Sequence, residues 1–118
     1  MTDYQIRIAI AELRGWRNCR YIAELHDCRG LPPAGYKGDR INLGEEAWLP
    51  DYLNDLNAMW EARETLTQEQ RREFLGWLTQ AVLPVYTTQE DYDWFTVHAT
   101  ARQQAEAFVR LHGKWVND

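Results

Sequence analysis

The sequence predicts a small α+β domain in which an antiparallel sheet packs between helices, an α-β-α sandwich with about four helices. Two observations lead to this class. Capping-box patterns, a threonine followed three residues later by a glutamine, recur along the chain and indicate helix starts. After the first predicted helix the apolar period changes to two, which is typical of a half-buried strand. With 118 residues, 45% of them hydrophobic, the chain is expected to form one domain, residues 1–118.

The first predicted helix runs from Asp3 to Arg14. Thr2 and Gln5 supply its capping box, and Gly15 supplies a stop. Alternating apolar residues in the same segment are also a strand signal, but the cap and the stop favour a helix. The predicted inward stripe is Ile6, Ala9, Ile10 and Leu13.

A strand is predicted next, over residues 16–26, because apolar and polar side chains alternate there. Residues 30–38 are rich in glycine and proline and predict a loop. Residues 40–43 and 92–97 are weaker candidates for further strands.

Three more helices complete the predicted fold. One begins at Pro50, since proline suits the first helical position, and runs to about Thr65. Its predicted inward stripe is Tyr52, Leu53, Leu56, Met59 and Trp60. Another runs from Gln68 to about Leu83, and the last from Ala101 to His112 with Ala101, Ala105, Phe108 and Val109 inward.

The charge of the chain is unevenly distributed. The formal net charge is -5, which argues against a general binder of long nucleic acids. Residues 14–40 nevertheless hold six basic side chains against three acidic ones. An acidic domain with one basic segment predicts a local anion site.

This basic segment also carries aromatic rings. Guanidinium groups pair with phosphates, and flat rings stack on bases. The predicted ligand-binding residues here are Trp16, Arg17, Arg20, Tyr36, Lys37 and Arg40. The alternative is a solvated hairpin whose arginines pair with surface acids.

The start of the last helix is a second candidate phosphate site. His98, Thr100 and Arg102 would stand beside free amides at the positive end of the helix dipole. Ordinary helix capping by Thr100, with Arg102 in solvent, is the alternative.

No pattern in the sequence indicates catalysis, a metal or a cofactor. Cys19, His26 and Cys28 fit no common zinc spacing, and Asp51 and Asp55 fall on a polar helix face. The two cysteines are expected to be free thiols, unless their strands lie side by side. We therefore expect a protein that is not an enzyme.

Three segments in order, residues 8–16, 49–59 and 98–108 followed by Gly113-Lys114-Trp115, resemble the phage ABA sandwich domain. This is a family of small proteins from tailed phages and prophages. The resemblance implies a helix–sheet–helix sandwich without an assigned enzyme activity. It also implies a likeness in architecture to phage sponge proteins, including the Thoeris anti-defence sponges, which sequester cyclic nucleotide immune signals at subunit interfaces of oligomers.

The expected function is therefore that of a phage anti-defence protein that sequesters a small nucleotide signal without cleaving it. The expected partners are a phosphate-bearing nucleotide and further copies of the chain, with no long nucleic acid and no membrane. We expect a cytoplasmic protein of the infected bacterial host, since no apolar run approaches the ~20 residues of a membrane span. The alternative is a protein-interaction module, which would need an exposed apolar patch.

Overall fold

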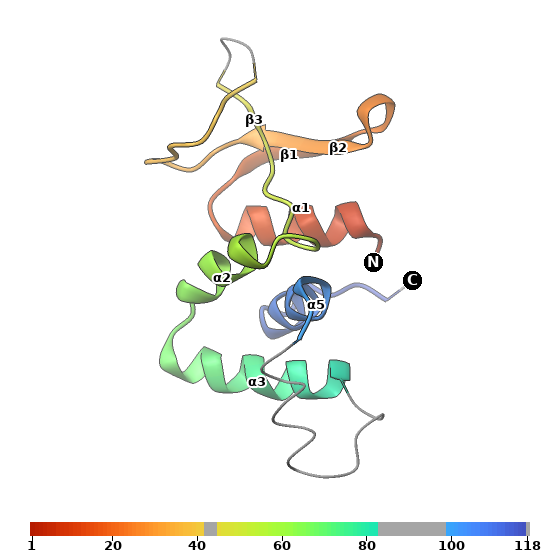
Figure 1. The fold of residues 1–118 in the computed structure, drawn as a ribbon, viewed down its shortest axis with the longest axis vertical. Coiled ribbons are helices and arrows are strands. Elements are labelled where there is room, and N and C mark those ends of the chain that lie inside the picture. Colours follow the sequence, from red (N-terminus) through yellow and green to blue (C-terminus); the bar gives the residue numbers. More distant parts are fainter. Residues whose placement is uncertain (42–44, 83–98, 118) are drawn as a thin grey trace.

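The computed structural model describes residues 1–41, 45–82 and 99–117, with the side chains of residues 81 and 82 left aside. The described residues form four α-helices and a three-stranded antiparallel sheet, so the predicted α+β class is confirmed (Figure 1). The elements in chain order are α1 (Asp3–Leu13), β1 (Arg17–Ile22), β2 (Asp27–Leu31), β3 (Ala47–Trp48), α2 (Leu56–Glu64), α3 (Gln68–Val82) and α5 (Ala101–Leu111). The strand predicted over residues 92–97 lies outside the described residues.

The predicted capping boxes form at all three helix starts. Thr2, Thr67 and Thr100 each accept from the backbone N–H three residues on, at 3.1–3.3 Å. The glutamine at that position accepts in return from the threonine N–H at 2.8–2.9 Å. Two otherwise unpaired backbone donors are thereby satisfied at each start. Gly15 has a φ of 96°, a left-handed conformation that ends α1 where the sequence predicted.

Strands β1 and β2 form a hairpin, whereas the sequence predicted a single strand over residues 16–26. A 3-10 turn over Ala23–Leu25 reverses the chain, and His26 closes the turn with a φ of 50°. The prediction that the first strand continues to residue 26 is therefore wrong. Gly30, predicted to lie in a loop, belongs to β2, where a Cβ would come within 3.0 Å of Cys19 Sγ.

The two cysteines lie on neighbouring strands but are not opposite one another. The register pairs Tyr21 with Cys28, and Cys19 stands across from Gly30. Both thiols are free. The third strand pairs Ala47 with Gly30 rather than starting at residue 40, where a strand was predicted.

The second helix begins later than predicted. The chain turns over residues 51–54, where the backbone C=O of Asp51 accepts from the N–H groups of Asn54 and Asp55. The Asp55 carboxylate then caps α2 by accepting from the N–H groups of Asn57 and Ala58. This late start shifts the buried face. Tyr52 and Leu53 are buried from the turn, whereas Leu56 and Trp60, predicted to face inward, are 56% and 58% exposed.

The helices of the described chain stack on one side of the sheet. Helix α1 covers one sheet face, α5 lies against α1, and α2 and α3 pack on α5 (Figure 1). The predicted layering, with helices on both faces, differs from this arrangement because the other face carries arginines, which are costly to bury. The predicted inner face of α5 is buried. No helix among the described residues is long and apolar enough to span a membrane.

Candidate functional site

The open face of the sheet gathers three of the six basic side chains of residues 14–40. The register pairs Arg17 with Leu31, Arg20 with Arg29, and Arg29 with Trp48. Directly paired residues point to the same side of a sheet. The opposite side, with Cys28, is buried beneath α1. We call this open surface, formed by Arg17, Arg20, Arg29, Leu31 and Trp48, the sheet face.

One glutamate partly neutralises the sheet face. Arg20 forms a two-pronged ion pair with Glu46, in which Nη2 donates to Oε1 at 2.9 Å and Nη1 donates to Oε2. This hydrogen bonding by Arg20 lowers the pKa of Glu46. Arg29 Nε lies 3.9 Å from the same carboxylate, but it is buried and has no hydrogen-bond partner in the described chain. Two guanidinium groups thus share one carboxylate, which leaves local positive charge.

A shallow hollow of about 330 Å³ adjoins the sheet face, lined by Arg17, Leu31, Pro32, Arg40 and Glu45. Arg17 is exposed and has no ion pair among the residues described. Arg40 Nη1 donates to the backbone C=O of Glu45 at 2.6 Å, and its guanidinium lies 5.8 Å from the Tyr36 ring centre. Lys37 is exposed nearby in the chain. Arg17 and Arg40 therefore meet at one hollow, with guanidinium N–H donors left over.

The aromatic part of the predicted site needs a correction. Trp16 is only 5% exposed and belongs to the core, so the prediction that it stacks on a ligand base is wrong. Its ring instead meets Tyr36 edge-on, with ring centres 5.3 Å apart, which holds the half-buried Tyr36 in place. The ring that the sheet face does present is Trp48, at 37% exposure. Sequence reasoning missed it because the third strand was expected at residues 40–43.

The second predicted phosphate site does not join the first. His98 lies outside the described residues. Thr100 caps α5, as the simpler alternative held, and Arg102 forms an ion pair with Asp3 at the start of α1. Arg17 follows the opposite end of α1, a helix of 11 residues that is ~16 Å long. The two groups of predicted ligands are therefore separated by the length of this helix.

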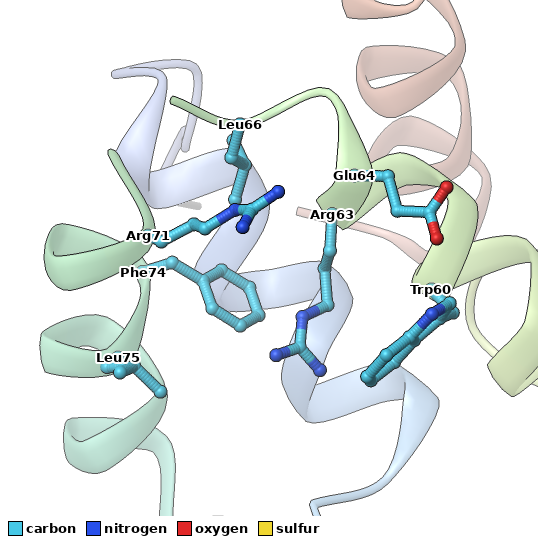
Figure 2. A pocket seen from close by; sticks show the side chains of 7 residues that line it. All are labelled: Trp60, Arg63, Glu64, Leu66, Arg71, Phe74 and Leu75. Carbon is cyan, nitrogen blue, oxygen red and sulfur yellow. The ribbon is translucent and has the colours of Figure 1, made fainter. Parts of the chain in front are cut away.

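A second arginine cluster, which sequence reasoning missed, lies between α2 and α3. This groove of about 380 Å³ is lined by Trp60, Arg63, Glu64, Leu66, Arg71, Phe74 and Leu75 (Figure 2). The Arg63 guanidinium stands between two rings, 4.9 Å from the centre of Trp60 and 4.8 Å from that of Phe74. Burial, followed by the charge of Arg71, lowers the pKa of Arg63. The cluster was hidden because Trp60 was expected in the core.

Apolar side chains are exposed around this groove. Leu56 and Trp60 project from α2, and Leu75, which is 47% exposed, projects from α3. An exposed apolar patch is the feature that the interaction-module alternative requires. Scattered exposed apolar residues are also ordinary, so the arginines of the groove are the more informative feature.

No group of three or more histidine, cysteine, aspartate or glutamate side chains converges within the described ranges. Burial, with a smaller contribution from Glu12, raises the pKa of Cys19 to about 11, so the thiol is protonated at neutral pH. His26 is exposed, and its Nδ1 lies 3.2 Å from the Tyr21 hydroxyl.

No family model, curated protein or solved structure matches the chain. The resemblance to the phage ABA sandwich domain therefore stays a prediction.

Proposed function

We propose that this protein binds a small phosphate-bearing nucleotide on its sheet face and sequesters it without cleaving it. The observation that carries the proposal is the gathering of four guanidinium groups on and beside one uncovered sheet surface. They belong to Arg17, Arg20, Arg29 and Arg40. Among the described residues, Glu46 pairs with two of these arginines, and Glu45 lines the hollow beside them.

The hollow beside the sheet supplies the place for a phosphate. Arg17 and Arg40 line it together, and a guanidinium binds phosphate oxygens through two parallel hydrogen bonds. Its volume is near the lower end of the range for small-molecule sites, roughly 300–1,000 Å³. Trp48 adds an exposed ring on the same face, where stacking contributes about 1–3 kcal/mol per base.

The charge of the whole chain supports a small ligand over a long one. With a net charge of -5, a polyanion extending beyond the sheet face would meet repulsive surface. A mononucleotide or cyclic dinucleotide confines its charge to the basic patch. The absence of long nucleic acid from the proposed partners follows from this distribution.

The biological setting in this proposal comes from the resemblance. A phage-encoded sponge would remove a cyclic nucleotide signal in the cytoplasm of the infected host, and such a protein needs affinity but no chemistry. On the sheet face, the carboxylate nearest to the arginines is Glu46, whose lowered pKa makes it a poor proton acceptor. Binding without conversion is consistent with this environment.

A homo-oligomer is part of the same proposal. Among the described strands, the order β1-β2-β3 leaves β1 at an edge of the sheet, and β1 carries Arg17 and Arg20. An edge strand can pair with another chain. Pairing of two β1 edges would place two sets of arginines beside one another, which suits a ligand with two phosphates. Light scattering with and without ligand measures this association.

Calorimetry against cyclic dinucleotides, cyclic trinucleotides and cyclic ADP-ribose isomers tests the proposed function. We expect one of these classes to bind, and the double variant Arg17→Gln/Arg40→Gln to weaken it by tenfold or more, at about 1.4 kcal/mol per tenfold. Arg102→Gln is the control, because Arg102 pairs with Asp3 away from the sheet face. Absence of binding by all three classes at high micromolar concentration would refute the proposal. Recovery of intact ligand after heating distinguishes a sponge from an enzyme.

A further inference from the structure

Arg63 is a half-buried cation without an anionic partner. No carboxylate oxygen lies within ion-pair distance of it in the described part of the chain. Among the described residues its one hydrogen bond runs from Nη1 to the buried side chain of Gln104, at 3.2 Å. Gln104 in turn donates to the backbone C=O of Ala99. Charges that leave water are normally paired, so this guanidinium is able to accept a counter-ion.

The surroundings of Arg63 determine from which direction an anion can approach. The rings of Trp60 and Phe74 flank the guanidinium on two sides (Figure 2). Nη1 is already engaged with Gln104. The remaining N–H groups of Arg63 have no hydrogen-bond partner among the described residues. A planar carboxylate accepts two parallel hydrogen bonds from a guanidinium and fits between flanking rings better than a bulky tetrahedral group.

The rest of the groove supplies a second cation and an apolar bed. Arg71 extends from α3 toward α2 and lines the groove with no ion pair among the described residues (Figure 2). Phe74 and Leu66 are buried at the bottom, and Trp60 and Leu75 form exposed rims. Glu64 also lines the groove, so a ligand with a single negative charge is favoured over a dianion.

We propose that the α2–α3 groove binds a small organic monoanion that joins a carboxylate to a flat apolar body. The carboxylate would pair with Arg63 and Arg71, and the apolar body would lie against Leu66, Leu75 and the indole of Trp60. This site lies between helices and is separate from the sheet face, so it does not depend on the proposed nucleotide binding.

The test compares two probes of the same shape, naphthoate and its neutral amide naphthamide, by two-dimensional N–H NMR of the full chain. We expect naphthoate to shift the Trp60 indole signal and to bind about tenfold more tightly than naphthamide, because a charged hydrogen-bonded pair is lost with the amide. The Trp48 signal on the sheet face should stay in place. Equal affinity for the two probes, or an unmoved Trp60 signal, would overturn the proposal.

Matched variants assign the effect to the groove. Arg71→Gln should weaken naphthoate binding about tenfold, and Arg63→Gln should weaken it at least as much. Arg72→Gln is the control, since Arg72 is exposed on the same helix but does not line the groove. Arg63→Gln also removes contacts with two rings and could lower stability. Arg71 is exposed, so the effect of Arg71→Gln on binding can be measured in a folded protein. An equal loss in Arg72→Gln would show that only net charge matters and would refute the site.

Discussion

The sheet face and the α2–α3 groove use the same residue types in different ways. On the sheet face, Arg20 is held by a carboxylate, and the ring of Trp48 stands free at 37% exposure. In the groove, Arg63 is held by two rings and an amide, and no carboxylate of the described residues neutralises it. A surface ion pair exchanges partners at little cost, whereas a stacked, half-buried cation is fixed in place. The first arrangement suits a charged ligand in water, and the second suits an anion with an apolar body.

The largest expected contrast concerns the two aromatic residues. Phe74 is 1% exposed, so Phe74→Ala should cost about 3–5 kcal/mol of unfolding free energy through lost burial and a cavity. Trp48→Ala should cost roughly 1 kcal/mol or less, because the ring is already partly in water. Urea denaturation measures both. A similar loss for Trp48→Ala would mean that the sheet ring is structural and is not a ligand platform.

Replacing an arginine by lysine in each region should have stability effects of intermediate size. Arg63→Lys loses stacking on two rings and the planar bond to Gln104, and should cost about 1–2 kcal/mol. Arg20→Lys retains a partly exposed ion pair with Glu46 and should cost clearly less than Arg63→Lys. Thermal and urea unfolding of the two variants give these values. If the order were reversed, the assignment of Arg63 as a fixed cation would fail.

The free energy of unfolding should fall at alkaline pH because of a thiol on the covered face of the sheet. Burial raises the pKa of Cys19 from 9.0 to about 11. The unfolded chain therefore loses this proton first, so the stabilisation is complete below pH 9 and is lost as pH rises toward 11. The loss should be on the order of 1 kcal/mol after solvent screening. Cys19→Ser, which keeps only the Cys28 thiol, should lose less stability between these pH values. An identical decline in both proteins would contradict the assignment.

The smallest expected effect follows from removing the shared carboxylate of the sheet face. Glu46→Gln releases Arg20 and leaves both arginines uncompensated. We expect little change in stability, because the pair is still partly exposed to water. Nucleotide affinity should rise and should fall more steeply with added salt. Calorimetry at two salt concentrations measures this, and a lower affinity than in the unchanged protein would show that Glu46 positions Arg20 for binding.

The capping boxes predicted helix starts correctly, whereas the start of the second helix could not be decided from its local sequence. The Thr–Gln pairs predicted three helix starts because both partners of a capping box lie within one turn. Pro50 and Asp55 both suit a helix start, and only the turn at residues 51–54 decides between them. That decision moved Leu56 and Trp60 to the surface.

The two candidate sites depend on contacts between distant residues. Arg20 and Glu46 meet only when β3 is in place, and Arg63 finds Phe74 and Gln104 on two other helices. The basic segment itself was visible as a local excess of charge. Which arginines of this segment are paired could not be predicted, because their partners come from elsewhere in the chain.

The most direct test of the account follows the indole N–H signals of Trp48 and Trp60 during titration with the nucleotide that calorimetry selects. Trp48 reports on the sheet face and Trp60 on the groove. We predict that the nucleotide shifts the Trp48 signal, that Arg17→Gln/Arg40→Gln abolishes this shift, and that Trp60 is unmoved. A shift of Trp60 alone, or a Trp48 shift that persists in the double variant, would contradict nucleotide binding by the arginines of the sheet face.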